Sequence, residues 1–89
     1  MICEQIQIIN RLGLHARAAA CFVKLAASFD SEVFLVYGEQ SVNGKSIMDI
    51  MMLAASQGTD MLIEVTGTDE IEAAEALVKL INNRFGEDE

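Results

Sequence analysis

The spacing of apolar residues switches repeatedly between alternation and a period of about 3.6, and this pattern restricts the possible folds most strongly. The strand-like segments are residues 6–9, 32–38, 39–44 and 61–67. The helix-like segments are residues 16–29, 46–55 and 68–86. The order β-α-β-β-α-β-α predicts an α+β fold, a two-layer open-faced sandwich with a four-stranded antiparallel sheet and three helices on one face. Since 89 residues supply only one core, we expect a single domain over 1–89.

The same spacing predicts which side chains are buried and where the helices begin. The expected core positions of the strands are Ile6, Ile8, Met61, Ile63 and Val65. Those of the helices are Ala19, Phe22, Val23, Ala26, Phe29, Ile50, Leu53, Ile71, Ala74, Val78 and Ile81. Ser46, followed three residues later by Asp49, resembles a capping box, and Thr68 or Asp69 is expected to cap the last helix.

Charge and composition exclude several classes of function. The chain has 6 Lys and Arg against 14 Asp and Glu, a net charge of -8, which argues against general nucleic-acid binding and against an anionic membrane surface. The acidic stretches TDEIEAAEA and GEDE are interpreted as a solvated helix face and a frayed tail. No apolar run is long enough to span a membrane, and the start MICEQIQIIN lacks the features of a signal peptide. We therefore expect a cytoplasmic protein.

Neither a metal ion nor another cofactor is expected. Cys3 and Cys21 fit no metal or redox spacing, and a single histidine without a ligand cluster does not make a metal site. In a protein that is not exported, the two thiols are expected to remain reduced.

The only histidine, His15, lies where the first helix is expected to begin, after Gly13 and two residues before Arg17. The first N–H groups of a helix have no partner within it, and together with the helix dipole they attract anions. An arginine adds a permanent charge and a donor fork suited to phosphate, and a neutral imidazole is a nucleophile. These residues can therefore accept a phosphoryl group, although a lone histidine at a helix start is more often a surface or capping side chain.

Two segments of the chain resemble a known family. GLHARAA (13–19) is similar to the active-site segment of HPr, the histidine-containing phosphocarrier of bacterial phosphotransferase systems, and VNGKSIMDIMMLAA (42–55) resembles its second signature. The resemblance implies that enzyme I phosphorylates His15 on Nδ1 with a group from phosphoenolpyruvate, that Arg17 assists, and that an EIIA-type protein accepts the group. It also implies that Ser46 is the site of an HPr kinase. The family usually has proline after the arginine, whereas this chain has Ala18, so the geometry of the helix start stays open.

The first two helices carry residues that are candidates for partner binding. They are Ala20, Cys21, Lys24 and Ala27 on the first helix and Ile47, Met48 and Met51 on the second. Methionine adapts to differently shaped partners, and nearby cations (Arg17, Lys24 and Lys45) would steer acidic proteins to this face. Members of the family dock enzyme I and their acceptors with these two helices.

We therefore expect a monomeric phosphoryl carrier for sugar uptake or its regulation, a substrate of other enzymes with a phosphohistidine intermediate and not an independent catalyst. One alternative is a regulatory binding module controlled by phosphorylation of Ser46. A carrier of the nitrogen-related phosphotransferase branch and a purely structural α+β module are the others.

Overall fold

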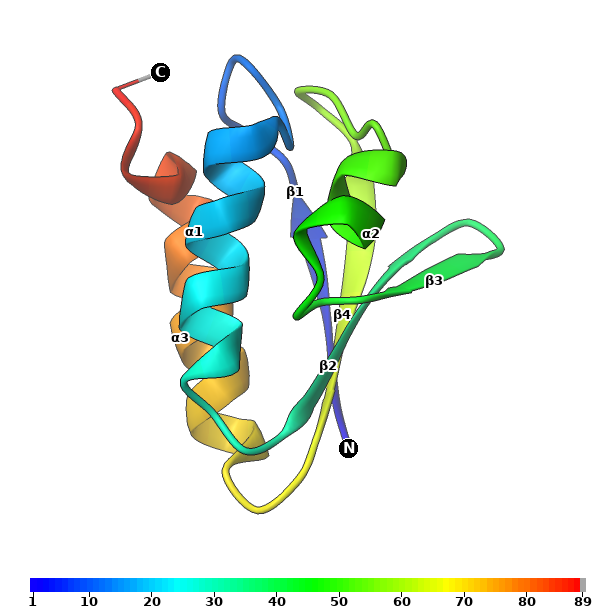
Figure 1. Ribbon diagram of the computed structural model, residues 1–89, viewed down its shortest axis with the longest axis vertical. Helices are drawn as coiled ribbons and strands as arrows, with labels where there is room; N and C mark the ends of the chain where they lie inside the picture. The colour runs from blue at the N-terminus through cyan, green and yellow to red at the C-terminus, as the bar shows by residue number, and fades with distance from the viewer. Residues whose placement is uncertain (89) are drawn as a thin grey trace.

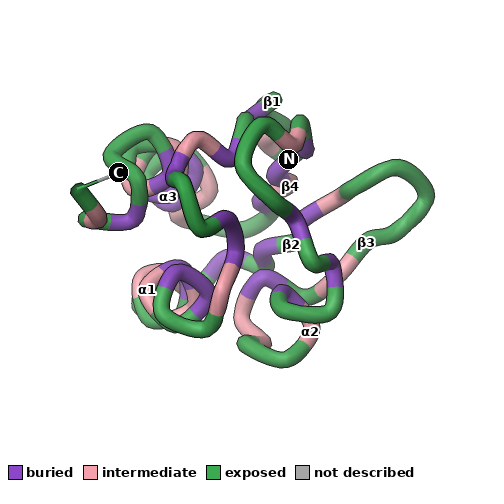
Figure 2. The backbone as a smooth tube through the Cα atoms, turned by 90° about the horizontal axis from the view of Figure 1, so that it is seen from above, coloured by how far each residue is buried: buried purple, intermediate pink, exposed green. Residues whose placement is uncertain are grey.

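A four-stranded antiparallel sheet forms one layer of the molecule, and the helices form the other (Figure 1). The computed structural model describes residues 1–88. The elements are β1 (Ile2–Gln7), α1 (Ala16–Ala27), β2 (Glu32–Tyr37), β3 (Gln40–Asn43), α2 (Ile47–Met52), β4 (Asp60–Thr66), α3 (Glu70–Asn82) and the short 3₁₀ turn η1 (Arg84–Gly86). The strand order is β1-β4-β2-β3, and all three helices cover the same face (Figure 2). This is the predicted architecture, although the first strand spans residues 2–7 and not the predicted 6–9.

The core lies between the sheet and the helices because the strands alternate as expected. In β4, Met61, Ile63 and Val65 are buried, and Ile63 lies opposite both Glu4 of β1 and Leu35 of β2. The other buried apolar side chains of the sheet layer are Ile6, Ile8, Val33 and Leu35. From the first two helices, Ala19, Phe22, Ala26, Ile50 and Leu53 are buried as expected. Val23 and Phe29 are half-buried at the margin of the core.

The buried face of α3 differs from the predicted one. The buried residues of this helix are Ala73, Ala74, Leu77 and Ile81. Ile71, which was expected in the core, is 61% exposed, and Val78 is only partly buried. The helix is apolar around more than half of its circumference, so periodicity alone allowed two neighbouring stripes. Packing against β1 and α1 selects the stripe with two adjacent alanines, whose small side chains permit a close approach.

The start of α3 is fastened to the loop between α1 and β2. Asp69 is the N-cap residue by position, but its carboxylate makes no capping bond and instead accepts hydrogen bonds from the Asp30 and Ser31 amides at 2.9 Å. It also accepts one from the Ser31 hydroxyl, and this bond in particular lowers the pKa of Asp69. Asp69, the expected cap, therefore links the start of α3 to the loop between α1 and β2.

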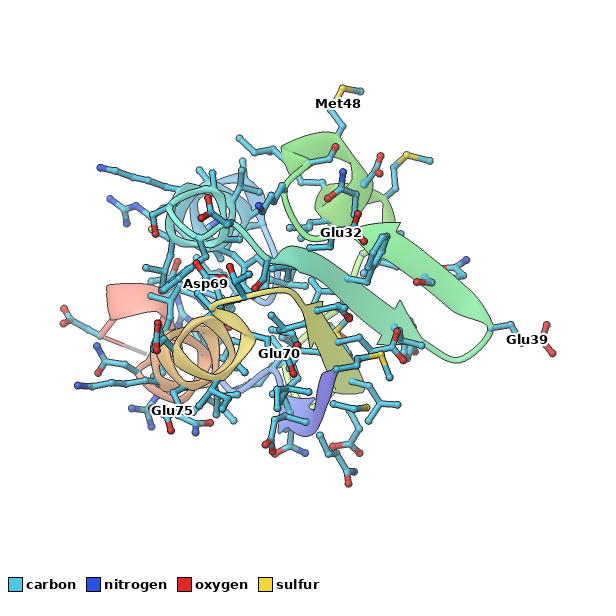
Figure 3. All side chains as sticks on the ribbon, turned by 90° about the horizontal axis from the view of Figure 1, so that it is seen from below. Glu32, Glu39, Met48, Asp69, Glu70 and Glu75 are labelled. Atoms are coloured by element: carbon cyan, nitrogen blue, oxygen red, sulfur yellow. The ribbon has the colours of Figure 1, made fainter. Side chains whose placement is uncertain are left out.

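Of the acidic stretch predicted to be solvated, Glu72 and Glu75 are exposed, whereas Asp69 and Glu70 are half-buried. Glu39, Met48 and Glu75 project outward from the molecule (Figure 3). None of the helices within residues 1–88 has the length and apolar character that crossing a bilayer requires. The C-terminal tail, also interpreted as solvated, lies beside the start of α1 (Figure 1).

Candidate functional site

The loop before α1 places His15 at the start of that helix. Gly13 has φ +72°, a conformation that favours glycine, and a Cβ there would lie 2.5 Å from the carbonyl oxygen of Ala55. The next amide, that of Leu14, donates to the same Ala55 oxygen at 2.9 Å. The loop is thus held against the segment that follows α2. His15 follows with φ -79° and ψ 179°, the extended backbone of an N-cap residue.

The amides of the first turn of α1 have no hydrogen-bond partner among the described residues. The first helical hydrogen bond runs from the Ala19 amide to the His15 carbonyl at 2.9 Å, so the amides of residues 16–18 precede the helical pattern. The His15 side chain makes no capping hydrogen bond, and the first turn contains no acidic residue. Arg17 is exposed and borders a hollow of about 390 Å³ shared with Leu12 and Glu87. A bound anion would find free N–H groups and a guanidinium here.

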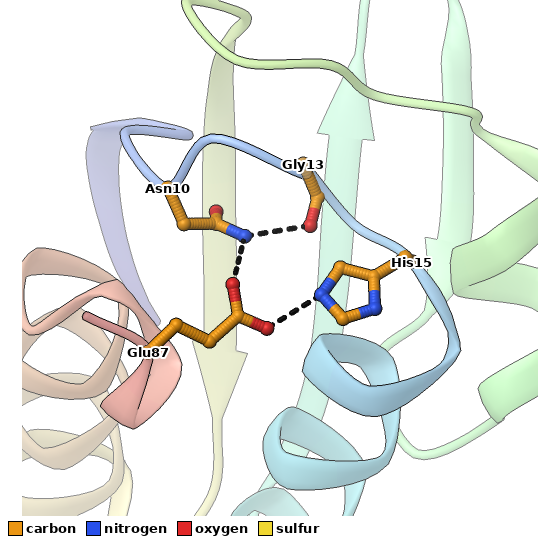
Figure 4. A network of polar contacts seen from close by, with 4 residues as sticks. All are labelled: Asn10, Gly13, His15 and Glu87. Atoms are coloured by element: carbon orange, nitrogen blue, oxygen red, sulfur yellow. Dashed lines mark hydrogen bonds and ion pairs between the residues drawn. The ribbon is translucent and has the colours of Figure 1, made fainter. Parts of the chain in front are cut away.

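The imidazole of His15 contacts the C-terminal segment. Its Nε2 lies 2.5 Å from Oε2 of Glu87, and the two side chains are 29% and 11% exposed (Figure 4). The other ring nitrogen, Nδ1, lies on the side away from Glu87, next to the first turn of α1 (Figure 4). Within residues 1–88, Glu87 is the only recorded hydrogen-bond partner of this ring.

A buried asparagine holds the other oxygen of Glu87. Nδ2 of Asn10 donates to Oε1 of Glu87 at 2.9 Å and to the carbonyl of Gly13 at 2.8 Å (Figure 4). Asn10 is completely buried, and its Oδ1 has no hydrogen-bond partner among the described residues. The amide therefore connects the loop before His15 to the tail that contacts His15.

The charge state of Glu87 follows from these neighbours. Burial raises the pKa of its carboxyl group, but the hydrogen bonds from Asn10 and His15, together with the charges of His15 and Arg17, outweigh this effect. The net result is a pKa below the ordinary value, so Glu87 is ionised at neutral pH. An ionised carboxylate only accepts hydrogen bonds.

The tail prediction was therefore wrong for Glu87, while Glu89 lies outside the described residues. The chain reverses after α3 because Arg84, Phe85 and Gly86 all have positive φ angles. Phe85 is only 4% exposed and packs into the core, which anchors this turn. An aromatic residue four positions from the end was the available sequence signal that the segment is not frayed.

The candidate docking residues lie on exposed parts of two packed helices. Ile47, Met48 and Met51 of α2 are 40%, 75% and 42% exposed, while Ile50 and Leu53 are buried as expected. On α1, Ala20, Lys24 and Ala27 are exposed and Cys21 is half-buried. Lys45 is partly engaged within the fold, since its ammonium group donates to the Phe29 carbonyl at 2.9 Å.

Sequence reasoning missed two exposed apolar side chains near these residues. Leu12 is 62% exposed and borders the hollow beside Arg17, and Met52 is 78% exposed on α2. The position of Leu12 in the glycine-containing turn before His15 was the sequence signal that its side chain is exposed. Met52 could not be separated from core residues because four apolar residues follow one another at positions 50–53.

Ser46 caps α2 as predicted. Its Oγ accepts a hydrogen bond from the Asp49 amide at 3.3 Å, and its φ of -120° and ψ of 115° are those of an N-cap residue. The helix is shorter than the predicted 46–55 and ends at Met52. The next turn tightens through i→i−3 bonds from Leu53 and Ala54, and Ala54 adopts a φ of 50°, which stops the helix.

Known proteins resemble this chain over its full length. Residues 2–83 match the family described as "PTS HPr component phosphorylation site". The phosphocarrier protein HPr of Neisseria meningitidis serogroup A is 53% identical over 89 residues, all of both chains. The HPr of Pseudomonas aeruginosa is 54% identical over 86 residues, 96% of each chain.

Solved structures agree with these sequence matches. HPr-C-His from Thermoanaerobacter tengcongensis superposes with a TM-score of 0.96 at 46% identity, over 100% of both chains. An HPr dimer from the same organism superposes with a TM-score of 0.78 at 49% identity, over 92% of this chain and 94% of that one. The matching motifs, the fold and the helix start at His15 lead to one conclusion: the chain belongs to the HPr family of phosphocarrier proteins.

Proposed function

We propose that this protein carries a phosphoryl group on Nδ1 of His15, taken from phospho-enzyme I and passed to an EIIA-type acceptor. The observation that carries the proposal is the start of α1, where Nδ1 of His15 and the first helix N–H groups have no hydrogen-bond partner among residues 1–88 and lie close to Arg17. Phosphoenolpyruvate is the original donor. The resemblance to HPr proteins supports this function over a regulatory module, a nitrogen-related carrier or a structural module.

The chemistry is a direct displacement at phosphorus. The lone pair of Nδ1 forms the new N–P bond while the bond between phosphorus and the donor breaks, and the donor keeps that electron pair. The oxygens of the transferred group then accept hydrogen bonds from the first-turn amides of α1, and the Arg17 guanidinium balances their charge. Transfer to the acceptor reverses these steps.

Partner proteins would dock on the exposed residues of α1 and α2 beside this site. The proposed contacts are Ala20, Cys21, Lys24 and Ala27 together with Ile47, Met48 and Met51. Apolar side chains at the centre and cations at the margin suit an acidic protein partner that must also release the carrier. The protein would act as a cytoplasmic monomer made of one domain over 1–89 and would bind neither nucleic acid nor membranes.

Ser46 is proposed as a second, regulatory phosphorylation site for an HPr kinase. Its hydroxyl group caps α2 next to Ile47 and Met48, so a dianion there would have to lose its water when a partner docks. The proposed consequence is weaker binding of enzyme I.

Intact mass spectrometry tests the carrier function directly. Incubation with enzyme I and phosphoenolpyruvate is expected to add one acid-labile phosphoryl group, and His15→Ala should remove the labelling entirely. Arg17→Ala serves as the folded control that still receives label, more slowly. Labelling of the His15→Ala protein at the parent level would contradict the proposal.

A further inference from the structure

We propose that Glu87 is a positioning residue that selects the reactive tautomer of His15, which extends the carrier function proposed above. By accepting a hydrogen bond from Nε2–H, the Glu87 carboxylate keeps the hydrogen on Nε2 and leaves the lone pair on Nδ1, the nitrogen beside the first turn of α1. Histidines that act in sites are commonly oriented in this way, because the partner of one ring nitrogen decides which nitrogen is left unprotonated.

The direction of the hydrogen bond follows from the chemistry of the pair. A carboxylate with a lowered pKa is ionised at neutral pH and has no proton to donate. The Nε2 atom, 2.5 Å from Oε2, must therefore carry the hydrogen in both the neutral and the protonated imidazole. In the neutral ring, this requirement places the nucleophilic lone pair on Nδ1.

The carboxylate is fixed in place, as a positioning group must be. Asn10 donates to its second oxygen at 2.9 Å, and the same amide nitrogen is held by the Gly13 carbonyl. Since Asn10 is completely buried, rotation of the Glu87 carboxylate would deprive a buried amide of one hydrogen-bond acceptor. The loop that carries His15 and the tail that carries Glu87 are thus aligned by one side chain.

The backbone conformation of the tail also supports the contact between Glu87 and His15. Arg84 and Phe85 have φ angles of 56° and 54°, which are unfavourable for residues with a Cβ, and Gly86 follows at 82°. Such strained residues persist only where packing holds them, and here the buried Phe85 does so. The Glu87 amide closes the turn by donating to the Arg84 carbonyl at 2.9 Å. The result is a rigid turn that directs Glu87 to His15.

The proton is retained through the transfer. When Nδ1 forms the N–P bond, the ring becomes an imidazolium whose hydrogen on Nε2 stays shared with Glu87. The positive charge of the ring is thereby balanced at the nitrogen that does not react. When phosphorus leaves for the acceptor, the electron pair of the N–P bond returns to Nδ1 and the neutral Nε2–H tautomer is restored. No further acid or base is required.

Nitrogen-15 NMR of the His15 ring measures the tautomer without any phosphoryl transfer. In the parent protein with a neutral ring, we expect the Nε2–H form to dominate. In Glu87→Ala, the fraction of the Nδ1–H form should rise about tenfold, as expected for the loss of one charge-assisted hydrogen bond. The matched control is Asp88→Ala, which removes the neighbouring exposed acid, a residue without a hydrogen bond to any described residue, and should leave the ratio unchanged.

Phosphoryl transfer from enzyme I gives the second measurement. Glu87→Ala should slow it about tenfold, in proportion to the tautomer shift, while Asp88→Ala keeps the parent rate. A dominant Nδ1–H form in the parent, or an unchanged tautomer ratio in Glu87→Ala, would overturn the inference, as would equal slowing in both variants. If the parent accepts no phosphoryl group at all, the carrier function fails, and the NMR comparison still decides the role of Glu87.

Discussion

The α1 helix begins at His15 without a side-chain cap, whereas α2 begins at Ser46 with one. In α2, the hydroxyl group of Ser46 accepts a hydrogen bond from the Asp49 amide, so one of the unpaired N–H groups at this helix start is satisfied locally. In α1, the amides of the first turn have no hydrogen-bond partner within residues 1–88, and the Glu87 carboxylate binds Nε2 of His15 instead of the helix. One helix start is thus built for stability and the other is kept free for an anion.

The contrast between the two helix starts explains why the carboxylate at the His15 site comes from the tail. An acid within the first turn of α1 would occupy the free amides and repel a phosphoryl group. A carboxylate that reaches Nε2 from residue 87 orients the ring from the opposite side. Substitutions at the two helix starts separate a role in phosphoryl transfer from a role in stability.

Arg17→Ala should slow phosphoryl transfer from enzyme I by about 100-fold, the scale for removing one donor that stabilises a transition-state anion. Its side chain is exposed, so thermal stability should stay at the parent level. Rapid-quench kinetics measures the rate, with Lys79→Ala, an exposed cation on α3, as the matched control. A rate equal to that of the parent would mean that the helix amides alone bind the group.

Ser46→Asp should weaken the binding of enzyme I about tenfold, or roughly 1.4 kcal/mol, because the new charge must be desolvated beside Ile47 and Met48. The fold should be retained, since aspartate is a good N-cap residue. Titration calorimetry and thermal melts separate the two effects. Thr68→Asp adds the same charge before α3, and if it weakens binding equally, net charge and not the location of Ser46 is responsible.

Ser46→Ala should lower the free energy of unfolding by about 1 kcal/mol, the typical contribution of an N-cap side chain. Thr68→Ala is the control, because the Thr68 side chain is exposed and makes no hydrogen bond to a described residue. Chemical denaturation of the three proteins gives the values. Equal stability of both variants would show that α2 does not depend on its cap.

Ala18→Pro should raise the free energy of unfolding by about 0.4–1 kcal/mol through a less flexible unfolded chain. Residue 18 is the third of α1, and its amide precedes the first helical hydrogen bond, which is made by Ala19. Denaturation tests this gain.

The lifetime of the phosphohistidine tests whether the same amide binds the phosphoryl group. A shorter lifetime in Ala18→Pro would show that the Ala18 amide is one of the donors. A marked loss of stability would contradict the predicted gain and would mean that the completely buried position of Ala18 has no room for a proline ring.

Local patterns predicted most of the fold. The strands and helices, the alternating core of β4 and the cap at Ser46 all follow from interactions between residues close in the chain, which is why period and capping motifs reveal them. The start of α1 at His15 was predictable for the same reason. The stripe of α3 was not, because Ile71 and Leu77 are both apolar and only the packing partner distinguishes them.

Local sequence patterns specify the elements, the helix start that can bind an anion, and the position of His15 and Arg17 in one turn. Only the tertiary structure decided that Glu87 meets His15 across 72 positions of the chain. The contact needs α3 packed beside α1, the turn at Arg84 and Phe85, and the buried Asn10. These three features depend on burial between segments that are far apart in the chain. Such burial produces no periodicity or spacing in the sequence, so the contact between two distant polar residues cannot be predicted from it.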